Sequence, residues 1–179
     1  DGVPDIAAGA FNMARVYSGA DGTILHSFHA EAEPCGPSSC YVQFGWAVDG
    51  LPDADGDGCN ELIVGSFPND VVLDLPGYAS VRSGKSGATL LVLQGDEPDQ
   101  GFGGAVAGLG DANGDGKPDF AVGAPLTGVN TGSVEVHSSV PLPLTSDVHL
   151  LSVQAGGIQT LLLDVGAGAS GLLYLVLGS

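Results

Sequence analysis

The sequence contains very few basic residues. Lysine and arginine together number 4, against 21 aspartates and glutamates, which gives a formal net charge of -17. Nucleic-acid binding needs clustered basic side chains on the phosphates, so the charge disfavours this class of partner. An anionic membrane surface is disfavoured for the same reason, because it also attracts basic segments.

Long apolar runs and helical periodicity are missing as well. No signal peptide, apolar run of about 18 residues or lipidation motif is found, and we interpret the numbered chain as a mature or trimmed form. The 179 residues include 30 Gly and 11 Pro, yet 44% are hydrophobic, which is too apolar for disorder. Short Val, Leu and Ile runs between Gly, Asp and Ser predict an all-β chain.

Cysteine is scarce, with three residues in the chain. Cys35 and Cys40 lie close together in the sequence, and we expect a disulfide between them in an oxidising compartment. Three cysteines cannot all pair within one chain. The thiol of Cys59 is therefore either free or paired with one of the other two.

The acidic residues are concentrated in short loops in which oxygen-bearing side chains alternate. In residues 111–119, alternate ligands let the loop curl around one hard cation, and Gly116 permits the sharp turn. Calcium takes six to eight oxygens from carboxylates, amides, backbone carbonyls and water, whereas magnesium keeps more of its waters. We expect calcium to be bound by Asp111, Asn113, Asp115, the Lys117 carbonyl and Asp119.

Residues 53–61 are a near copy of this loop, and we expect a second calcium ion there. Its ligands are Asp53, Asp55, Asp57, the Cys59 carbonyl and Glu61. An EF-hand is the obvious alternative, but its loop closes with Glu at position twelve, where this chain has Val64 and Val122. Two like charges about 4 Å apart repel by roughly 4 kcal/mol at an effective dielectric near 20, so such acidic clusters favour a bound cation.

The loops belong to a longer internal repeat. Residues 44–67 align with 102–125, residues 14–19 align with 79–84, and residues 134–138 are a weaker third copy. Each repeat has about four short strands, which is close to one propeller blade.

This chain resembles the FG-GAP repeats that form the blades of integrin-α-type β-propellers. Phe102-Gly103 and Phe44-Gly45 correspond to the "FG", and residues 123–125 read Gly-Ala-Pro, while residues 65–67 read Gly-Ser-Phe and depart from it. The resemblance covers roughly residues 1–139. It implies an extracellular, calcium-stabilised module that serves adhesion or scaffolding.

The N-terminal residues resemble the second half of an acidic loop. Residues 1–10 align with 115–124, which makes Asp1 and Asp5 candidate calcium ligands. The missing ligand positions would be supplied either by residues upstream or by another chain.

Residues 140–179 depart from the repeat and form an apolar tail. We predict strands at 148–153, 158–165 and 172–177, buried against the repeats or against a neighbouring chain. The expected architecture is therefore about two and a half FG-GAP-type blades over residues 1–139, followed by a β-rich tail.

Other motifs are weaker. Residues 166–171 fit a dinucleotide-binding GxGxxG, but this site needs a helix next, and the eight residues that follow are predicted to form a strand. The Gly84-Lys85-Ser86 stretch is interpreted as a hairpin turn rather than a phosphate loop, and Trp46 with Tyr41 leaves carbohydrate stacking open.

These observations predict a non-enzymatic, secreted or cell-surface calcium-binding module with a structural or adhesive role. Its partners are expected to be copies of itself, in a fibre or oligomer, or other extracellular proteins. The alternative is a fragment of a larger secreted propeller protein, lectin-like or enzyme-associated, whose ligand site lies elsewhere.

Overall fold

The computed structural model describes residues 1–30, 42–68, 75–127, 131–138 and 149–152. In this part of the chain the regular elements are all strands, and no helix is long and apolar enough to cross a membrane. The strands are β1 (Ile6–Ala10), β2 (Met13–Tyr17), β3 (Ile24–His29), β4 (Val42–Leu51), β5 (Glu61–Pro68), β6 (Tyr78–Arg82), β7 (Thr89–Gln94), β8 (Ala105–Gly110), β9 (Asp119–Ala124), β10 (Ser133–Ser138) and β11 (His149–Ser152).

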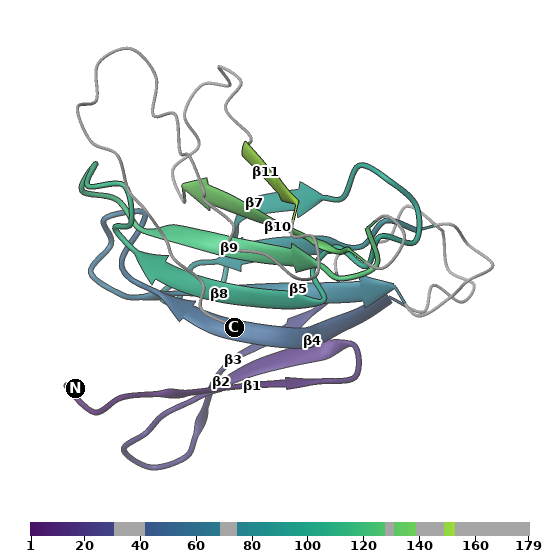
Figure 1. Ribbon diagram of the computed structural model, residues 1–179. Helices are drawn as coiled ribbons and strands as arrows, with labels where there is room; N and C mark the ends of the chain where they lie inside the picture. The colour runs from purple at the N-terminus through teal and green to yellow at the C-terminus, as the bar shows by residue number, and fades with distance from the viewer. Residues whose placement is uncertain (31–41, 69–74, 128–130, 139–148, 153–179) are drawn as a thin grey trace.

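The described strands form three antiparallel sheets that stack on one another without closing into a ring (Figure 1). The first sheet has the order β1-β2-β3, the second β4-β5-β6-β7 and the third β11-β10-β9-β8. Two four-stranded blades and one partial blade confirm the predicted all-β, propeller-type fold. The second and third sheets therefore correspond to the internal repeats of the sequence. Loops 53–61 and 111–119 lie at equivalent places in these two sheets.

Part of the predicted tail lies in the third sheet. Strand β11 falls within the predicted strand at 148–153 and pairs with β10. The division into domains at residue 139 stays a prediction. The predicted strands at 158–165 and 172–177, and the predicted Cys35–Cys40 disulfide, lie outside the described residues.

The hydrophobic core between the sheets is formed by alternate residues along the strands. On β9, Phe120, Val122 and Ala124 are buried, and they share one hydrophobic cluster with Ala79 and Val81 on β6 of the second sheet. Successive residues of a strand point to opposite faces, so this period of two directs one face of each sheet toward its neighbour. Full burial of a large apolar side chain contributes roughly 1.5–3 kcal/mol.

Glycines set how closely the sheets approach. A Cβ placed on Gly65 of β5 would lie 2.2 Å from the carbonyl oxygen of Gly103, and one on Gly9 of β1 would lie 2.0 Å from that of Gly45. Gly45 and Gly103 have φ values of 87° and 84°, a conformation that favours glycine. The glycine of each Phe-Gly pair therefore packs directly on a glycine of the preceding sheet.

The third sheet carries the same glycine with no described residue stacked on it. A Cβ on Gly123 would meet only atoms of Ala105 within 4 Å, the nearest at 3.3 Å. Next to Gly123 lies an open hollow of about 420 Å³, lined also by Gly104, Pro125 and Val134. Among the described residues, nothing covers on the third sheet the contact face that is used twice inside the molecule.

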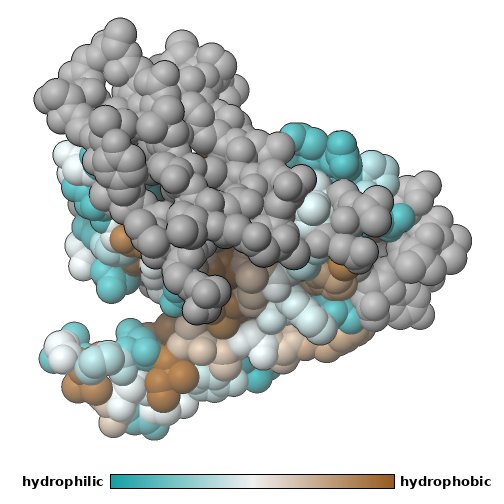
Figure 2. All heavy atoms as spheres, viewed as in Figure 1, coloured by the Kyte–Doolittle hydropathy of each residue, from teal (hydrophilic) through white to brown (hydrophobic). Residues whose placement is uncertain are grey.

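The opposite end of the stack exposes apolar side chains. Figure 2 shows brown surface in the lower part of the molecule, where Figure 1 places the first sheet. Ile6, Phe11 and Ile24, from this part of the chain, are each more than half exposed.

Candidate metal centre

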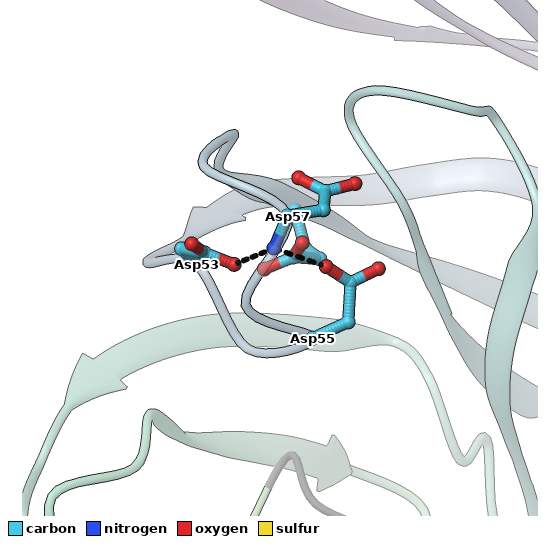
Figure 3. A group of neighbouring side chains, drawn as sticks. Asp53, Asp55 and Asp57 are labelled. Carbon is cyan, nitrogen blue, oxygen red and sulfur yellow. Dashed lines mark hydrogen bonds between the residues drawn. The ribbon is translucent and has the colours of Figure 1, made fainter.

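The loop at 53–61 gathers its four carboxylates at one point between β4 and β5. Figure 3 shows three of them, Asp53, Asp55 and Asp57. One oxygen from each of Asp53, Asp55, Asp57 and Glu61 lies within 4.8 Å of the others, and no other group of three or more His, Cys, Asp or Glu side chains in the described residues does so. Asp53 and Asp55 are exposed, Asp57 is half-buried and Glu61 is buried. The arrangement is a small acidic cup that opens to solvent.

Backbone amides hold these carboxylates in place. Asp53 accepts hydrogen bonds from the N–H groups of Gly56 (2.7 Å), Asp57 (3.1 Å) and Gly58 (2.9 Å). Gly56 and Gly58 have φ values of 82° and 87°, so the loop needs glycine at both places to turn its N–H groups inward. Glu61 reaches back to accept from the N–H of Ala54 at 2.6 Å.

The loop at 111–119 repeats this hydrogen-bond frame. Asp111 accepts from the N–H groups of Gly114 (2.7 Å), Asp115 (2.9 Å) and Gly116 (2.9 Å). Asp119 accepts from the N–H of Ala112 at 2.9 Å, as Glu61 does from Ala54. The two loops therefore share one backbone frame.

The central positions also match. Asp55 accepts from the N–H of Asp57 at 3.0 Å, and Asn113 accepts from that of Asp115 at 2.9 Å. The main difference is chemical, because the second of the alternating positions is a carboxylate in loop 53–61 and an amide, Asn113, in loop 111–119.

The remaining predicted ligand positions fall on the same frame. The N–H of Cys59 donates to Asp57, and the N–H of Lys117 donates to Asp115, each at 2.9 Å. At the N-terminus, the N–H of Val3 donates to Asp1 at 2.8 Å in the same way. The Cys59 side chain is a free, half-buried thiol.

Asp5 takes the place of the closing carboxylate in the partial N-terminal loop. Its Oδ1 accepts from the N–H of Gly19 at 3.1 Å. Asp1 and Asp5 lie just before β1 (Ile6–Ala10), and their role as ligands stays a prediction.

The closing carboxylates of the two loops, Glu61 and Asp119, have raised pKa values. Burial, reinforced by the charges of Asp55, Asp53 and Asp57, raises the pKa of Glu61 to about 7. Burial also raises the pKa of Asp119, with a smaller contribution from the neighbouring aspartates. A buried carboxylate among like charges favours a proton or a cation as its neighbour.

One buried oxygen bears directly on whether the site fits a metal. Glu61 Oε1 is buried and has no hydrogen-bond partner among the described residues, while its Oε2 is bonded to the backbone. A buried polar atom without a partner is costly. A hard cation held by these carboxylates would satisfy this oxygen, so the chemistry of the donor set fits a hard divalent cation such as calcium.

Two further residues touch loop 53–61 and were not predicted as part of the site. Ser83 Oγ donates to Asp57 Oδ2 at 3.2 Å, and Lys85 Nζ donates to the Asp57 carbonyl at 2.8 Å. Both lie in the β6–β7 hairpin (residues 83–88), which confirms the hairpin interpretation of Gly84-Lys85-Ser86. The Ser-Gly pair that recurs at residues 18–19 and 83–84 was the available signal in the sequence.

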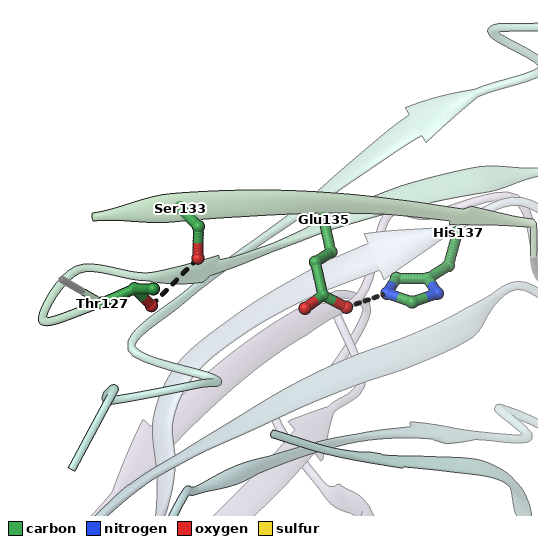
Figure 4. Close-up of polar contacts among 4 residues, drawn as sticks. All are labelled: Thr127, Ser133, Glu135 and His137. Atoms are coloured by element: carbon green, nitrogen blue, oxygen red, sulfur yellow. Dashed lines mark hydrogen bonds and ion pairs between the residues drawn. The ribbon is translucent and has the colours of Figure 1, made fainter. Parts of the chain in front are cut away.

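A second polar group lies along β10 (Figure 4). His137 Nε2 lies 3.0 Å from Glu135 Oε2, and its ring stacks on Phe120 with centroids 5.6 Å apart. Ser133 Oγ donates to Thr127 Oγ1 at 3.0 Å. This row is occupied by contacts within its own sheet, and Ser133 and His137 are not hydrogen-bonded to each other in the way that activates a nucleophile.

Comparison with known proteins identifies the repeat and a relative that contains similar sequence. The family model of the FG-GAP repeat matches residues 102–137. Integrin alpha-7 of Rattus norvegicus is 35% identical over 122 residues, which covers 65% of this chain and 10% of that protein. The chain therefore corresponds to about a tenth of the length of this relative.

Proposed function

Because the chain is a member of the FG-GAP repeat family, we propose that it is an extracellular structural or adhesive module stabilised by calcium. The similarity to an integrin alpha chain supports a secreted or cell-surface location and protein partners. A binding and scaffolding role, rather than an enzymatic one, accords with the family.

The duplicated acidic loop is the observation that carries the calcium proposal. Loops 53–61 and 111–119 hold their side chains with the same backbone hydrogen bonds, and the four carboxylates of loop 53–61 meet at one point. In each loop, three alternating side chains, one carbonyl and the closing carboxylate provide the hard oxygen ligands of calcium. Asp1 and Asp5 would contribute to a third site only together with oxygens from elsewhere.

Calcium titration of the chain tests this proposal. We expect two sites with dissociation constants of about 10⁻⁴–10⁻³ M, the range of extracellular modules. Asp53→Asn should remove one site and Asp111→Asn the other, because each substitution neutralises the carboxylate that anchors its loop. Asp96→Asn, an exposed acid outside both loops, is the matched control and should keep both. Retention of both sites by both loop variants would refute the calcium assignment.

We also propose that the open stack joins other copies of itself or other extracellular proteins. The Gly123 face is the third copy of a contact surface that is occupied twice inside the molecule. The first sheet exposes apolar side chains at the other end of the stack. Exposed apolar surface and unpaired strand edges favour association between chains.

Sedimentation of the chain in millimolar calcium tests assembly. We expect species heavier than the monomer, and we expect Gly123→Ala to shift them toward the monomer, because a Cβ there would obstruct close backbone contact. A monomer in the wild type would instead favour the alternative, a piece of a larger propeller whose further blades cover this face. The 10% coverage of the integrin relative motivates that alternative.

A further inference from the structure

The β6–β7 hairpin lies between loop 53–61 and the first sheet and contacts both. On one side, Ser83 Oγ and Lys85 Nζ donate to Asp57 at 3.2 and 2.8 Å. On the other, His26 of β3 donates from Nε2 to the Gly84 carbonyl at 2.7 Å. These contacts join residues far apart in the sequence through three consecutive hairpin residues, Ser83, Gly84 and Lys85.

Gly84 is the point where the hairpin rests on the loop. A Cβ at this position would lie 1.9 Å from the carbonyl oxygen of Asn60, a backbone atom next to the closing Glu61. The first sheet repeats the arrangement, because a Cβ on Gly19 would lie 1.9 Å from the carbonyl oxygen of Pro4. The contact is thus built twice from the same Ser-Gly pair.

The third repeat differs at this position. Alignment of residues 134–138 with 79–83 makes Ser139 the equivalent of Gly84. A serine carries the Cβ for which the other two repeats have no room. Ser139 itself lies outside the described residues, so the glycine contact is described at loop 53–61 and at the N-terminal loop.

The hairpin also lies against the first sheet by packing. His26 stacks on Phe28 with ring centroids 5.6 Å apart, and a Cβ on Gly87 would lie 3.1 Å from His26 Nδ1. The guanidinium carbon of Arg82, just before the hairpin, lies 5.9 Å from the Phe28 ring centroid. A shift of the hairpin would therefore change the contacts of His26 and Phe28 on β3 directly.

We propose that Ser83, Gly84 and Lys85 are positioning residues that couple cation binding in loop 53–61 to the packing of β3 on the second sheet. Without a cation, repulsion among the four carboxylates loosens Asp57, the residue that the hairpin holds. A bound cation fixes Asp57, the hairpin is fixed with it, and the Gly84 carbonyl is kept in place for His26. This inference rests on the proposed calcium binding.

Hydrogen exchange of the full chain, with calcium and with chelator, tests the coupling. In the wild type, calcium should slow exchange in loops 53–61 and 111–119, and also in β3 residues 24–29. The expected slowing in β3 is about two- to tenfold, the factor that corresponds to one hydrogen bond. In Gly84→Ala, the slowing should persist in loop 111–119 and disappear from residues 24–29.

Ser86→Ala is the matched control, because Ser86 lies in the same hairpin and its Oγ accepts only a local bond from the N–H of Ala88. It should keep the wild-type response. If Gly84→Ala does not fold, the double variant Ser83→Ala/Lys85→Met tests the same coupling, because it adds no Cβ. It should also lose the calcium response of residues 24–29.

The possible failures are distinct. Calcium protection of the loops without any change in residues 24–29 of the wild type would overturn the coupling and leave calcium binding intact. So would a calcium response in residues 24–29 that survives in the folded hairpin variants. Absence of calcium protection from both loops would overturn the proposed function itself.

Discussion

In a solution where free calcium is tenfold above the dissociation constant of each of the two sites, bound calcium should stabilise the fold by about 3 kcal/mol. Removal of calcium is expected to lower the free energy of unfolding by this amount. For a chain of this size, the melting temperature should fall by roughly 6–12 °C. The reason is that the carboxylates of loop 53–61 meet at one point, and the backbone hydrogen bonds of both loops form, only in the folded state. Thermal unfolding with calcium and with chelator measures the difference. The double variant Asp53→Asn/Asp111→Asn should respond far less, and an equal response would contradict the assignment.

The effect of calcium should depend on pH. Burial raises the pKa of Glu61 from its ordinary value of 4.5 to about 7, so without metal the folded chain retains a proton that the unfolded chain has lost. The metal-free protein should therefore lose about 1–3 kcal/mol of stability as pH rises from about 4.5 to 7. Calcium needs the ionised carboxylate, so its stabilisation should grow over the same window. A calcium effect that shrinks as pH rises would count against Glu61 as a ligand.

Gly65→Ala is expected to destabilise the protein by about 3 kcal/mol or more, at the upper end of overpacking substitutions. The added methyl group would lie 2.2 Å from the carbonyl oxygen of Gly103, and a backbone atom cannot move aside without separating the second and third sheets. Denaturant unfolding, followed by the shift of the midpoint, measures this loss.

Gly123→Ala is the control for that substitution, because it makes the same change at the equivalent position of the third sheet. The added methyl group would meet Ala105 Cβ at 3.3 Å and no backbone atom nearer than 3.7 Å. We expect the free energy of unfolding of the monomer to stay within about 1 kcal/mol of the wild type, with the reduced freedom of the unfolded chain offsetting part of the crowding. Equal losses at positions 65 and 123 would mean that stacking between the sheets is not the cause.

The sequence predicted the strands and the acidic loops well, because both depend on local spacing. Alternating oxygens before Val-Gly strands identified loops 53–61 and 111–119, and β5 and β9 follow them as expected. The contacts of Asp57 with Ser83 and Lys85 could not be predicted, because they join segments about 26 residues apart and depend on how the hairpin folds back. The recurring Ser-Gly pair in the sequence indicated that the hairpin is part of the repeat, but not that it contacts the acidic loop.

The packing role of the Phe-Gly pairs could not be predicted from local sequence either. Gly45 and Gly103 were recognised as a motif, but their partners, Gly9 and Gly65, lie in other sheets. Only the stacking of the sheets shows why a side chain is excluded at both positions. Pairing of β11 with β10 is likewise a long-range event, set by the path of the chain between them.

Contacts between the sheets follow chain order, because β1 and β2 meet β4, and β4 and β5 meet β8. Stability in such an array is a sum of terms within each unit and between neighbours. The consequence is mechanical. A load pulling the first and third sheets apart is carried by two junctions in series, each closed by one glycine pair, and the weaker junction sets the load that the whole stack can bear.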